Sequence, residues 1–197
     1  MRATTRALEK LQGAQSIVLV EGLSDQIALE TAAGAQGRRL DDEGVVIVPL
    51  GGAHAIGPFL ATCRDAGART RLRGLCDAHE QDIYRRALMA AGVVPSHGDV
   101  VLEQHGFFVC VEDLEDELIR ALGVRQVGAV LESQGDLAAF RSLQHQPAWR
   151  GRAPEAQLHR FLGSGSRRKL RYALLLVEAA AAQDALPRPL GAVLAAA

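Results

Sequence analysis

Four short runs of apolar residues in the first half of the chain predict the strands of a buried sheet. Each run is continuous rather than alternating, which is typical of strands that are covered on both faces. Helical patterns follow the runs and begin near residues 24, 54, 80 and 113. The expected strands are residues 16–20, 45–48, 72–76 and 107–111. Strands that alternate with helices predict an α/β fold, in which a mostly parallel sheet is flanked by helices.

The second half of the chain has no strand pattern after about residue 123. Helices are predicted there at residues 126–133, 136–144, 154–162 and 167–184, and a short amphipathic helix is predicted at residues 3–12. We therefore expect three parts, which are an N-terminal helix (1–14), an α/β core (15–123) and an all-helical C-terminal extension (124–197).

Composition excludes several classes of protein. The chain has 197 residues, a formal net charge of -1 and three cysteines without a C-x-x-C pair, so neither a zinc site nor a disulfide framework is expected. The longest apolar run, residues 172–182, contains Glu178 and is too short to span a bilayer. No signal peptide is recognisable at the N-terminus. We expect a cytoplasmic protein that does not associate with membranes.

Acidic residues follow three of the four predicted strands, and the carboxyl ends of parallel strands meet at one edge of the sheet. They are Glu21 and Asp25, then Asp77 with His79 and Glu80, and finally the run Glu112-Asp113-Leu114-Glu115-Asp116. A single carboxylate at such a position often caps a helix. Several clustered carboxylates repel one another, and a bound Mg²⁺ or Mn²⁺ relieves that repulsion. The coincidence of three clusters favours a metal site.

The same residues resemble the motifs of a known family. Residues 17–25, Ile-Val-Leu-Val-Glu-Gly-Leu-Ser-Asp, are similar to the opening motif of TOPRIM domains, with the E-x-x-x-D spacing of the OLD (overcoming lysogenization defect) family nucleases. Residues 48–56 resemble that family's second strand and Gly-Gly turn. Asp113-Leu-Glu115 resembles its later acidic motif, and Lys169 resembles its downstream lysine. The resemblance covers roughly residues 15–175 and implies a stand-alone, TOPRIM-like (Rossmann-like) domain, similar to the nuclease domain of OLD-family ATP-dependent endonucleases.

The resemblance implies a metal-dependent endonuclease that cleaves DNA phosphodiesters, with RNA as an open alternative, by a mechanism that uses two ions of Mg²⁺ or Mn²⁺. One ion is then expected on Glu21, Asp77 and Glu80, with His79 as a further candidate, and the other on Asp25, Asp113 and Glu115. The residues expected to act in catalysis are Glu21 and Lys169. Glu112 and Asp116 are expected to point elsewhere, because they lie on other faces of their helix.

Two departures from the family leave a second function open. Asp77-Ala78-His79 stands where TOPRIM domains usually carry Asp-x-Asp, and imidazole suits Mn²⁺ better than Mg²⁺. The chain also has no G-x-x-x-x-G-K-[ST] motif and hence no ATP site of its own. The alternative is a catalytically impaired TOPRIM module that binds nucleic acid or a partner protein. A homodimer and a separate ATPase partner are also open.

Basic residues gather in the helical extension around Lys169, although the whole chain is nearly neutral. Such a patch suits the phosphate backbone of nucleic acid. The arginines expected to bind nucleic acid are Arg160, Arg167, Arg168 and Arg171. The remaining histidines have no metal-ligand spacing and are expected to be structural or solvated, and they are His54, His97, His105, His145 and His159.

Overall fold

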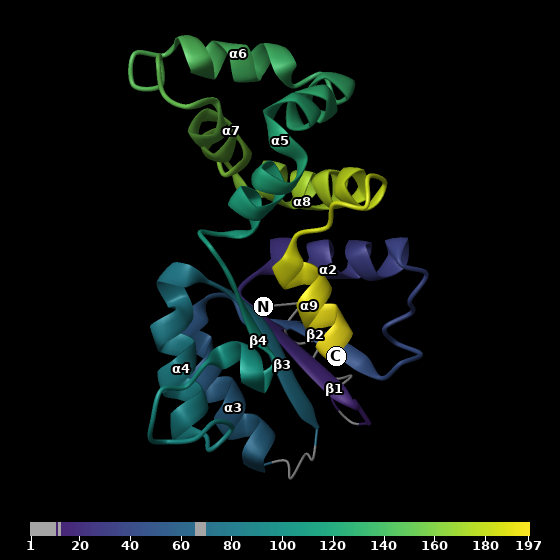
Figure 1. Ribbon diagram of the computed structural model, residues 1–197, viewed down its shortest axis with the longest axis vertical. Helices are drawn as coiled ribbons and strands as arrows, with labels where there is room; N and C mark the ends of the chain where they lie inside the picture. Colours follow the sequence, from purple (N-terminus) through teal and green to yellow (C-terminus); the bar gives the residue numbers. More distant parts are fainter. Residues whose placement is uncertain (1–10, 12, 66–69) are drawn as a thin grey trace.

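A four-stranded parallel sheet, in the order β2–β1–β3–β4, forms the centre of the protein (Figure 1). The computed structural model describes residues 11, 13–65 and 70–197. The strands are β1 (Ser16–Val20), β2 (Val45–Pro49), β3 (Arg71–Asp77) and β4 (Phe107–Cys110). In the centre of the sheet, Ile17 pairs with Val46 on one side and with Leu72 on the other. The α/β fold and the four strands predicted from the sequence are confirmed.

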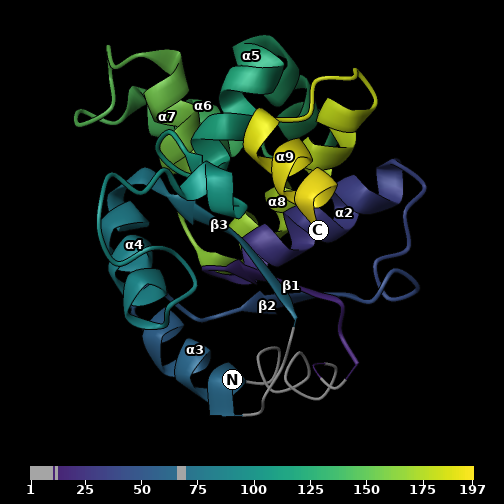
Figure 2. The same cartoon turned by 60° about the horizontal axis from the view of Figure 1, so that its bottom comes forward.

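Helices cover both faces of the sheet. The helices next to it are α2 (Leu23–Ala35), α3 (Ile56–Asp65), α4 (Gln81–Ala90) and α9 (Arg188–Ala196), and the short 3-10 helices are η1 (Ala53–Ala55), η2 (Ala78–Glu80) and η3 (Leu102–His105). On one face lie α3 and α4, and on the other lie α2 and α9 (Figures 1 and 2). No helix in the described parts of the chain is long and apolar enough to cross a membrane.

The central strand β1 shows why the apolar runs are continuous. All five of its residues are buried, and successive side chains enter two different cores. Val18 and Val20 pack in the core under α2, whereas Ile17 and Leu19 pack in the core under α3 and α4. The four positions from Ile17 to Val20 are therefore all apolar, and the hydroxyl of the buried Ser16 donates a hydrogen bond to the carbonyl of Arg71.

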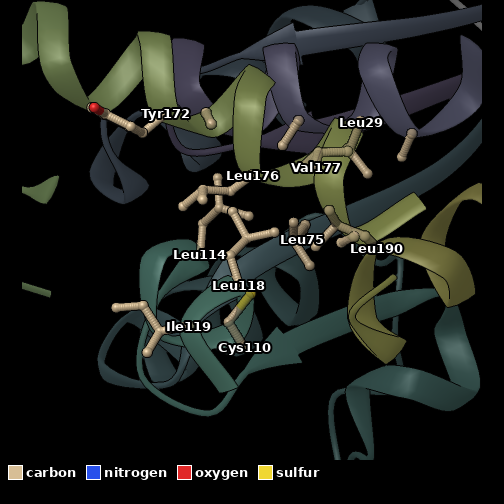
Figure 3. Close-up of a cluster of buried hydrophobic side chains, with 14 of the residues drawn as sticks. Leu29, Leu75, Cys110, Leu114, Leu118, Ile119, Tyr172, Leu176, Val177 and Leu190 are labelled. Atoms are coloured by element: carbon tan, nitrogen blue, oxygen red, sulfur yellow. The ribbon is translucent and has the colours of Figure 1, made fainter. Parts of the chain in front are cut away.

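The C-terminal half is helical, as predicted, and packs on the core above α2. Its helices are α5 (Leu114–Ser133), α6 (Leu137–His145), α7 (Pro154–Leu162) and α8 (Ser166–Ala181). Leu176 and Val177 of α8 meet Leu29 of α2 and Leu114 of α5 in one buried cluster (Figure 3). The helical extension thus shares its core with the α/β part and does not bury a separate one.

The helices of the second half follow the prediction, with one exception. The segments expected at 113–122 and 126–133 are two helical stretches, labelled together as α5, which are separated at Gly123, whose φ of 74° and ψ of 158° are not helical. The last helix, α9, was not predicted. Pro187 is its N-cap and Pro189 lies in its first turn, where a helix does not need the missing N–H. Apart from Leu11, the helix expected at residues 3–12 lies outside the described residues.

Replacement of Leu176 by alanine should strongly destabilise the protein. Its side chain is 1% exposed at the junction of α2, α5 and α8, and a buried leucine cut back to alanine costs about 2–5 kcal/mol. Leu174, on the same helix but 40% exposed, is the matched control and should change the free energy of unfolding by no more than about 0.5 kcal/mol. Denaturant unfolding of both variants measures the difference. Equal losses would contradict this packing of α8.

Candidate functional site

Carboxylates gather at the carboxyl-terminal edge of the sheet, where parallel α/β folds bind their ligands. Glu21 directly follows β1, Asp77 is the last residue of β3, and Asp113 follows the end of β4 and caps α5. These three strands are neighbours in the sheet. The fold therefore brings the three acidic clusters to one place, as their positions in the sequence predict.

Glu21 links the ends of three strands through hydrogen bonds. Its Oε1 accepts a hydrogen bond from the backbone N–H of Asp77 at 2.9 Å. Its backbone carbonyl accepts the N–H groups of Gly51 at 2.9 Å and Gly52 at 3.0 Å, in the turn after β2. Both glycines have positive φ angles, 82° and 121°, which residues with a side chain rarely adopt. The Gly-Gly turn thus closes over the end of β1 and holds Glu21 in place.

Asp25 lies in the first turn of α2 and caps it, since its Oδ2 accepts the backbone N–H of Gly22 at 2.8 Å. The same carboxylate interacts electrostatically with Glu21, Glu115 and Lys169. The sequence leaves open whether Asp25 caps a helix or belongs to an acidic cluster. In the structure it does both.

Asp113 is fixed by two contacts. Its Oδ1 accepts the backbone N–H of Asp116 at 2.9 Å, which makes Asp113 the N-cap of α5. Its Oδ2 lies 2.7 Å from Nε2 of His159 in α7. From the sequence, His159 was expected to be structural or solvated, because no motif or spacing connects it with Asp113. Only the packing of α7 against α5 brings the two side chains together.

The helical extension also contributes a cation. Lys169 lies in the first turn of α8, and its Nζ is 3.1 Å from Oε2 of Glu115, whose side chain is 6% exposed. The lysine also interacts electrostatically with Glu21, Asp25, Asp77 and Asp113. One ammonium group therefore faces carboxylates from the ends of all three strands.

Burial and repulsion disfavour the charged forms of most of these acids. Burial, and then the nearby charge of Glu21, raises the pKa of Asp77 to about 8. Burial raises the pKa of Asp25 to about 6, although the hydrogen bond from Gly22 opposes the shift. Burial is also the main reason why the pKa values of Glu115 and Glu21 are raised. A bound cation would favour the charged forms of all four acids.

Asp113 behaves differently from the other acids. Burial acts to raise its pKa, but hydrogen bonds from His159 and from the backbone of Asp116 lower it below the ordinary value. The same contact with Asp113 raises the pKa of His159. Burial opposes the charged form of Lys169, yet Glu115 raises the pKa of the lysine above its ordinary value. Lys169 therefore stays protonated at neutral pH.

Comparisons with known proteins identify the family and the fold that this chain resembles. The family model of the "Overcoming lysogenization defect protein-like, TOPRIM domain" matches residues 14–73. The C-terminal region of the Burkholderia pseudomallei OLD protein has the same fold, with a TM-score of 0.65, 22% identity, and coverage of 93% of this chain and 96% of that chain. The chain resembles the OLD-like TOPRIM domain. Both the family resemblance and the TOPRIM-like fold predicted from the sequence are confirmed.

A second OLD structure gives the same result. The C-terminal region of the Xanthomonas campestris pv. campestris OLD protein has a TM-score of 0.62 and 21% identity, and the match covers 92% of this chain and 93% of that chain. At such low identity these structures establish a common fold. Among the curated proteins, no sequence matches this chain.

The TOPRIM motif after β3 departs from Asp-x-Asp, and the structure distinguishes the two residues that might replace the second aspartate. His79 is exposed and forms no hydrogen bond or ion pair with the described residues. Glu80 is half-buried in the same short helix, η2, and its charge raises the pKa of Glu21. Glu80 is therefore electrostatically coupled to the acidic cluster.

The donor chemistry of this TOPRIM edge fits a hard divalent cation, which prefers carboxylate oxygens. Within residues 11, 13–65 and 70–197, no three His, Cys, Asp or Glu side chains lie close enough together to form a ready-made metal site. Burial, and then the charges of neighbouring acids, raises the pKa values of Asp25 and Asp77, and a bound cation would oppose both shifts. TOPRIM domains generally bind divalent metals, and these residues are suited to do so.

The predicted nucleic-acid-binding arginines differ in their availability. These residues are Arg160, Arg167, Arg168 and Arg171. Arg160 and Arg167 are exposed and form no hydrogen bond or ion pair within the described parts of the chain. The guanidinium of Arg168 lies 4.1 Å from the ring centre of Phe161, and Arg171 forms an ion pair of 3.4 Å with Asp136. The first two arginines are therefore free for an external anion, whereas the other two stabilise the helical extension.

We expect the metal-free protein to lose stability as the pH rises from about 5 to about 8. An acid whose pKa is raised by folding stabilises the folded state at low pH, and this contribution is lost as the pH rises through the folded pKa. The pKa values of about 6 for Asp25 and about 8 for Asp77 set this window. Millimolar Mn²⁺ should raise the melting temperature, more so at high pH, because metal and protons compete for the same carboxylates.

Thermal unfolding across this pH range provides the measurement, with Asp77→Asn as the comparison. The substitution removes the highest of these pKa values, so stability should depend less on pH above about 6. If Mn²⁺ leaves the melting temperature of the wild-type protein unchanged at every pH, the clustered carboxylates do not bind metal.

Proposed function

We propose that this protein is a divalent-metal-dependent nuclease, which cleaves the phosphodiester bonds of DNA, or alternatively RNA, by a two-metal mechanism. The observation that carries the proposal is the meeting of carboxylates from three strand ends with a lysine at one edge of the sheet. The residues that meet are Glu21, Asp25, Asp77, Asp113, Glu115 and Lys169. The family resemblance supports the same class, because the OLD-like TOPRIM domain is a nuclease-type, metal-binding module.

Two sets of acids would hold the ions. The first set is Glu21, Asp77 and Glu80, and the second set is Asp25, Asp113 and Glu115. Bound Mg²⁺ or Mn²⁺ would polarise the scissile phosphate and lower the pKa of the attacking water. The protein's own contribution is to hold these acids in position through the hydrogen bonds from Asp77 to Glu21 and from Asp116 to Asp113. Groups held in advance need little rearrangement when charge develops in the transition state.

Lys169 and Glu21 are the residues that we assign to catalysis. The ammonium group of Lys169 is held by Glu115 at 3.1 Å and stays protonated, because Glu115 raises its pKa. It is suited to stabilise the negative charge that develops on the transferring phosphoryl group. Glu21 directly follows the strand β1 and interacts with Glu80, Lys169 and Asp113, so it links both proposed sets of ligands.

Nucleic acid would reach this edge over the exposed arginines of the extension. Arg160 directly follows His159 on α7, and Arg167 is two residues before Lys169 on α8, so both lie near residues of the site. The net charge of -1 provides no general attraction for nucleic acid. The side chains of these two arginines would supply that attraction locally by binding the phosphate backbone of the nucleic acid.

The second candidate is a catalytically impaired module that binds nucleic acid or a partner protein. It is favoured by the exposed His79, which stands where the TOPRIM motif usually carries an acid. Both candidates are compatible with a homodimer or with a separate ATPase partner, so cleavage itself must separate them.

Lys169→Ala should slow the cleavage of supercoiled plasmid about 10²–10³-fold, which is the usual cost of losing one preorganised charge-stabilising donor. Its affinity for nucleic acid should remain within a few-fold of the wild type. Arg167→Ala should weaken nucleic-acid binding with less effect on the cleavage rate, because it loses one phosphate contact. Its binding should also depend less on salt, by about one unit of slope. Cleavage rates and binding titrations at several salt concentrations measure both effects.

The control for these variants is Arg39→Ala, because Arg39 is exposed before β2, at the opposite edge of the sheet, and is paired with Asp42. It should match the wild type in both measurements. If the Lys169 and Arg167 variants lose rate and affinity in parallel, Lys169 belongs only to the basic surface. If no preparation cleaves plasmid with Mg²⁺ or Mn²⁺, the binding module replaces the nuclease.

Glu80→Ala should lower the cleavage rate at least about tenfold, whereas His79→Ala should be tolerated. Glu80 is the half-buried acid that interacts with Glu21, and loss of a group that supports a metal site commonly costs about 10–100-fold. Plasmid cleavage in Mg²⁺ and in Mn²⁺ measures both variants. If His79→Ala is inactive and His79→Asp improves cleavage in Mg²⁺, the imidazole occupies the ligand position and our assignment of Glu80 is wrong.

A further inference from the structure

His159 belongs to none of the sequence motifs, yet it contacts a central acid of the site. Its Nε2 lies 2.7 Å from Oδ2 of Asp113, which is 46 residues earlier in the chain. This separation has the normal length of a charge-assisted hydrogen bond. The acid comes from the end of the sheet and the histidine from the helical extension, so the contact joins the two halves of the protein at the site.

The direction of this hydrogen bond follows from chemistry. An ionised carboxylate can only accept, so Nε2 of His159 must carry the proton and donate it. The other oxygen of Asp113, Oδ1, accepts the backbone N–H of Asp116 at 2.9 Å. One donor on each oxygen fixes the plane of the carboxylate group. Each oxygen keeps a further lone pair, which remains available to a cation.

The helix that carries His159 is itself held firmly. Leu158, Phe161 and Leu162 of α7 are buried in the same core cluster as α5 and α8. The ring of Phe161 packs against Phe140 of α6 with a centroid separation of 5.4 Å. The backbone under His159 therefore has little freedom, while the imidazole ring itself is half-exposed at the edge of the site. A donor on a rigid helix can determine the orientation of its acceptor.

We propose that His159 is a positioning residue, which orients the carboxylate of Asp113 for a divalent cation without binding the ion itself. This inference rests on the proposed function, because it requires that Asp113 bind metal. Donors behind the ligands of a metal fix the orientation of those ligands, and their loss typically weakens metal binding about 10–100-fold. The helical extension then completes the site by orienting an acid of the α/β core.

Two substitutions of His159 separate positioning from a structural role. His159→Leu places an apolar side chain at this position of α7 and removes the hydrogen-bond donor. His159→Gln keeps an N–H donor that can reach the position of Nε2. Mn²⁺ affinity is measured by titration calorimetry, and stability by thermal unfolding without metal. The control is His145→Leu, because His145 is exposed on α6 and its ring hydrogen-bonds to the carbonyl of Arg141 on its own helix, while its contact with Arg150 uses the backbone carbonyl, which the substitution keeps.

We expect His159→Leu to weaken Mn²⁺ binding about 10–100-fold, with His159→Gln within a few-fold of the wild type and His145→Leu unchanged. If His159→Leu binds Mn²⁺ as tightly as the wild type, the positioning role is refuted. If its melting temperature is nevertheless lower, His159 is only a structural link between α5 and α7. If the Leu and Gln variants lose affinity equally, the imidazole is a ligand and the proposal is wrong.

Asp113→Asn provides a second test that does not depend on the stability of His159→Leu alone. If His159 acts through Asp113, adding His159→Gln or His159→Leu to Asp113→Asn should cause no further loss of Mn²⁺ affinity. Independent, additive losses would overturn the proposal. Failure of the wild-type protein to bind Mn²⁺ would refute the proposed metal site itself. Wild-type binding with an unaffected His159→Leu would refute only the role of the histidine.

Discussion

Burial of several carboxylates at one edge of the sheet, together with the repulsion among them, is the constraint on which the site depends. Part of it is relieved by backbone N–H groups, which donate to Glu21, Asp25 and Asp113. Another part is relieved by Lys169, whose ammonium group interacts with acids from all three strand ends. These contacts do not offset the burial of Asp77, which, together with the charges of Glu21, Asp25 and Asp113, raises its pKa to about 8. An edge with this excess of negative charge is suited to collect cations.

Hydrophobic packing positions the charges that moderate this repulsion. Lys169 lies on α8, which is held against α2 by buried residues such as Leu176 and Leu29 (Figure 3). His159 lies on α7, which is held by Leu158 in the same core. The extension and the α/β core therefore depend on each other: the core brings the acids together, and the extension supplies the cation and the hydrogen-bond donor.

Much of the fold was predictable because its determinants are local. Continuous apolar runs predicted the four strands, and the parallel order predicted that acids after β1, β3 and β4 would meet. The short helix α9 was not predicted, and its two prolines, Pro187 and Pro189, both lie at its N-terminal end, where a helix tolerates them. The availability of the arginines was also not predictable from the sequence, where Arg168 and Arg171 look the same as Arg167. In the folded protein Arg168 packs on Phe161 and Arg171 pairs with Asp136.

By itself the sequence determined the α/β architecture, the Gly-Gly turn and the spacing of Glu21 and Asp25, because each of these depends on residues that are neighbours in the chain. Only the tertiary structure decided that Glu80 rather than His79 is coupled to the acids, and that His159 reaches Asp113. The choice between Glu80 and His79 depends on which face of η2 is half-buried. The contact of His159 depends on how α7 packs against α5, which is determined by the whole core and by no local pattern.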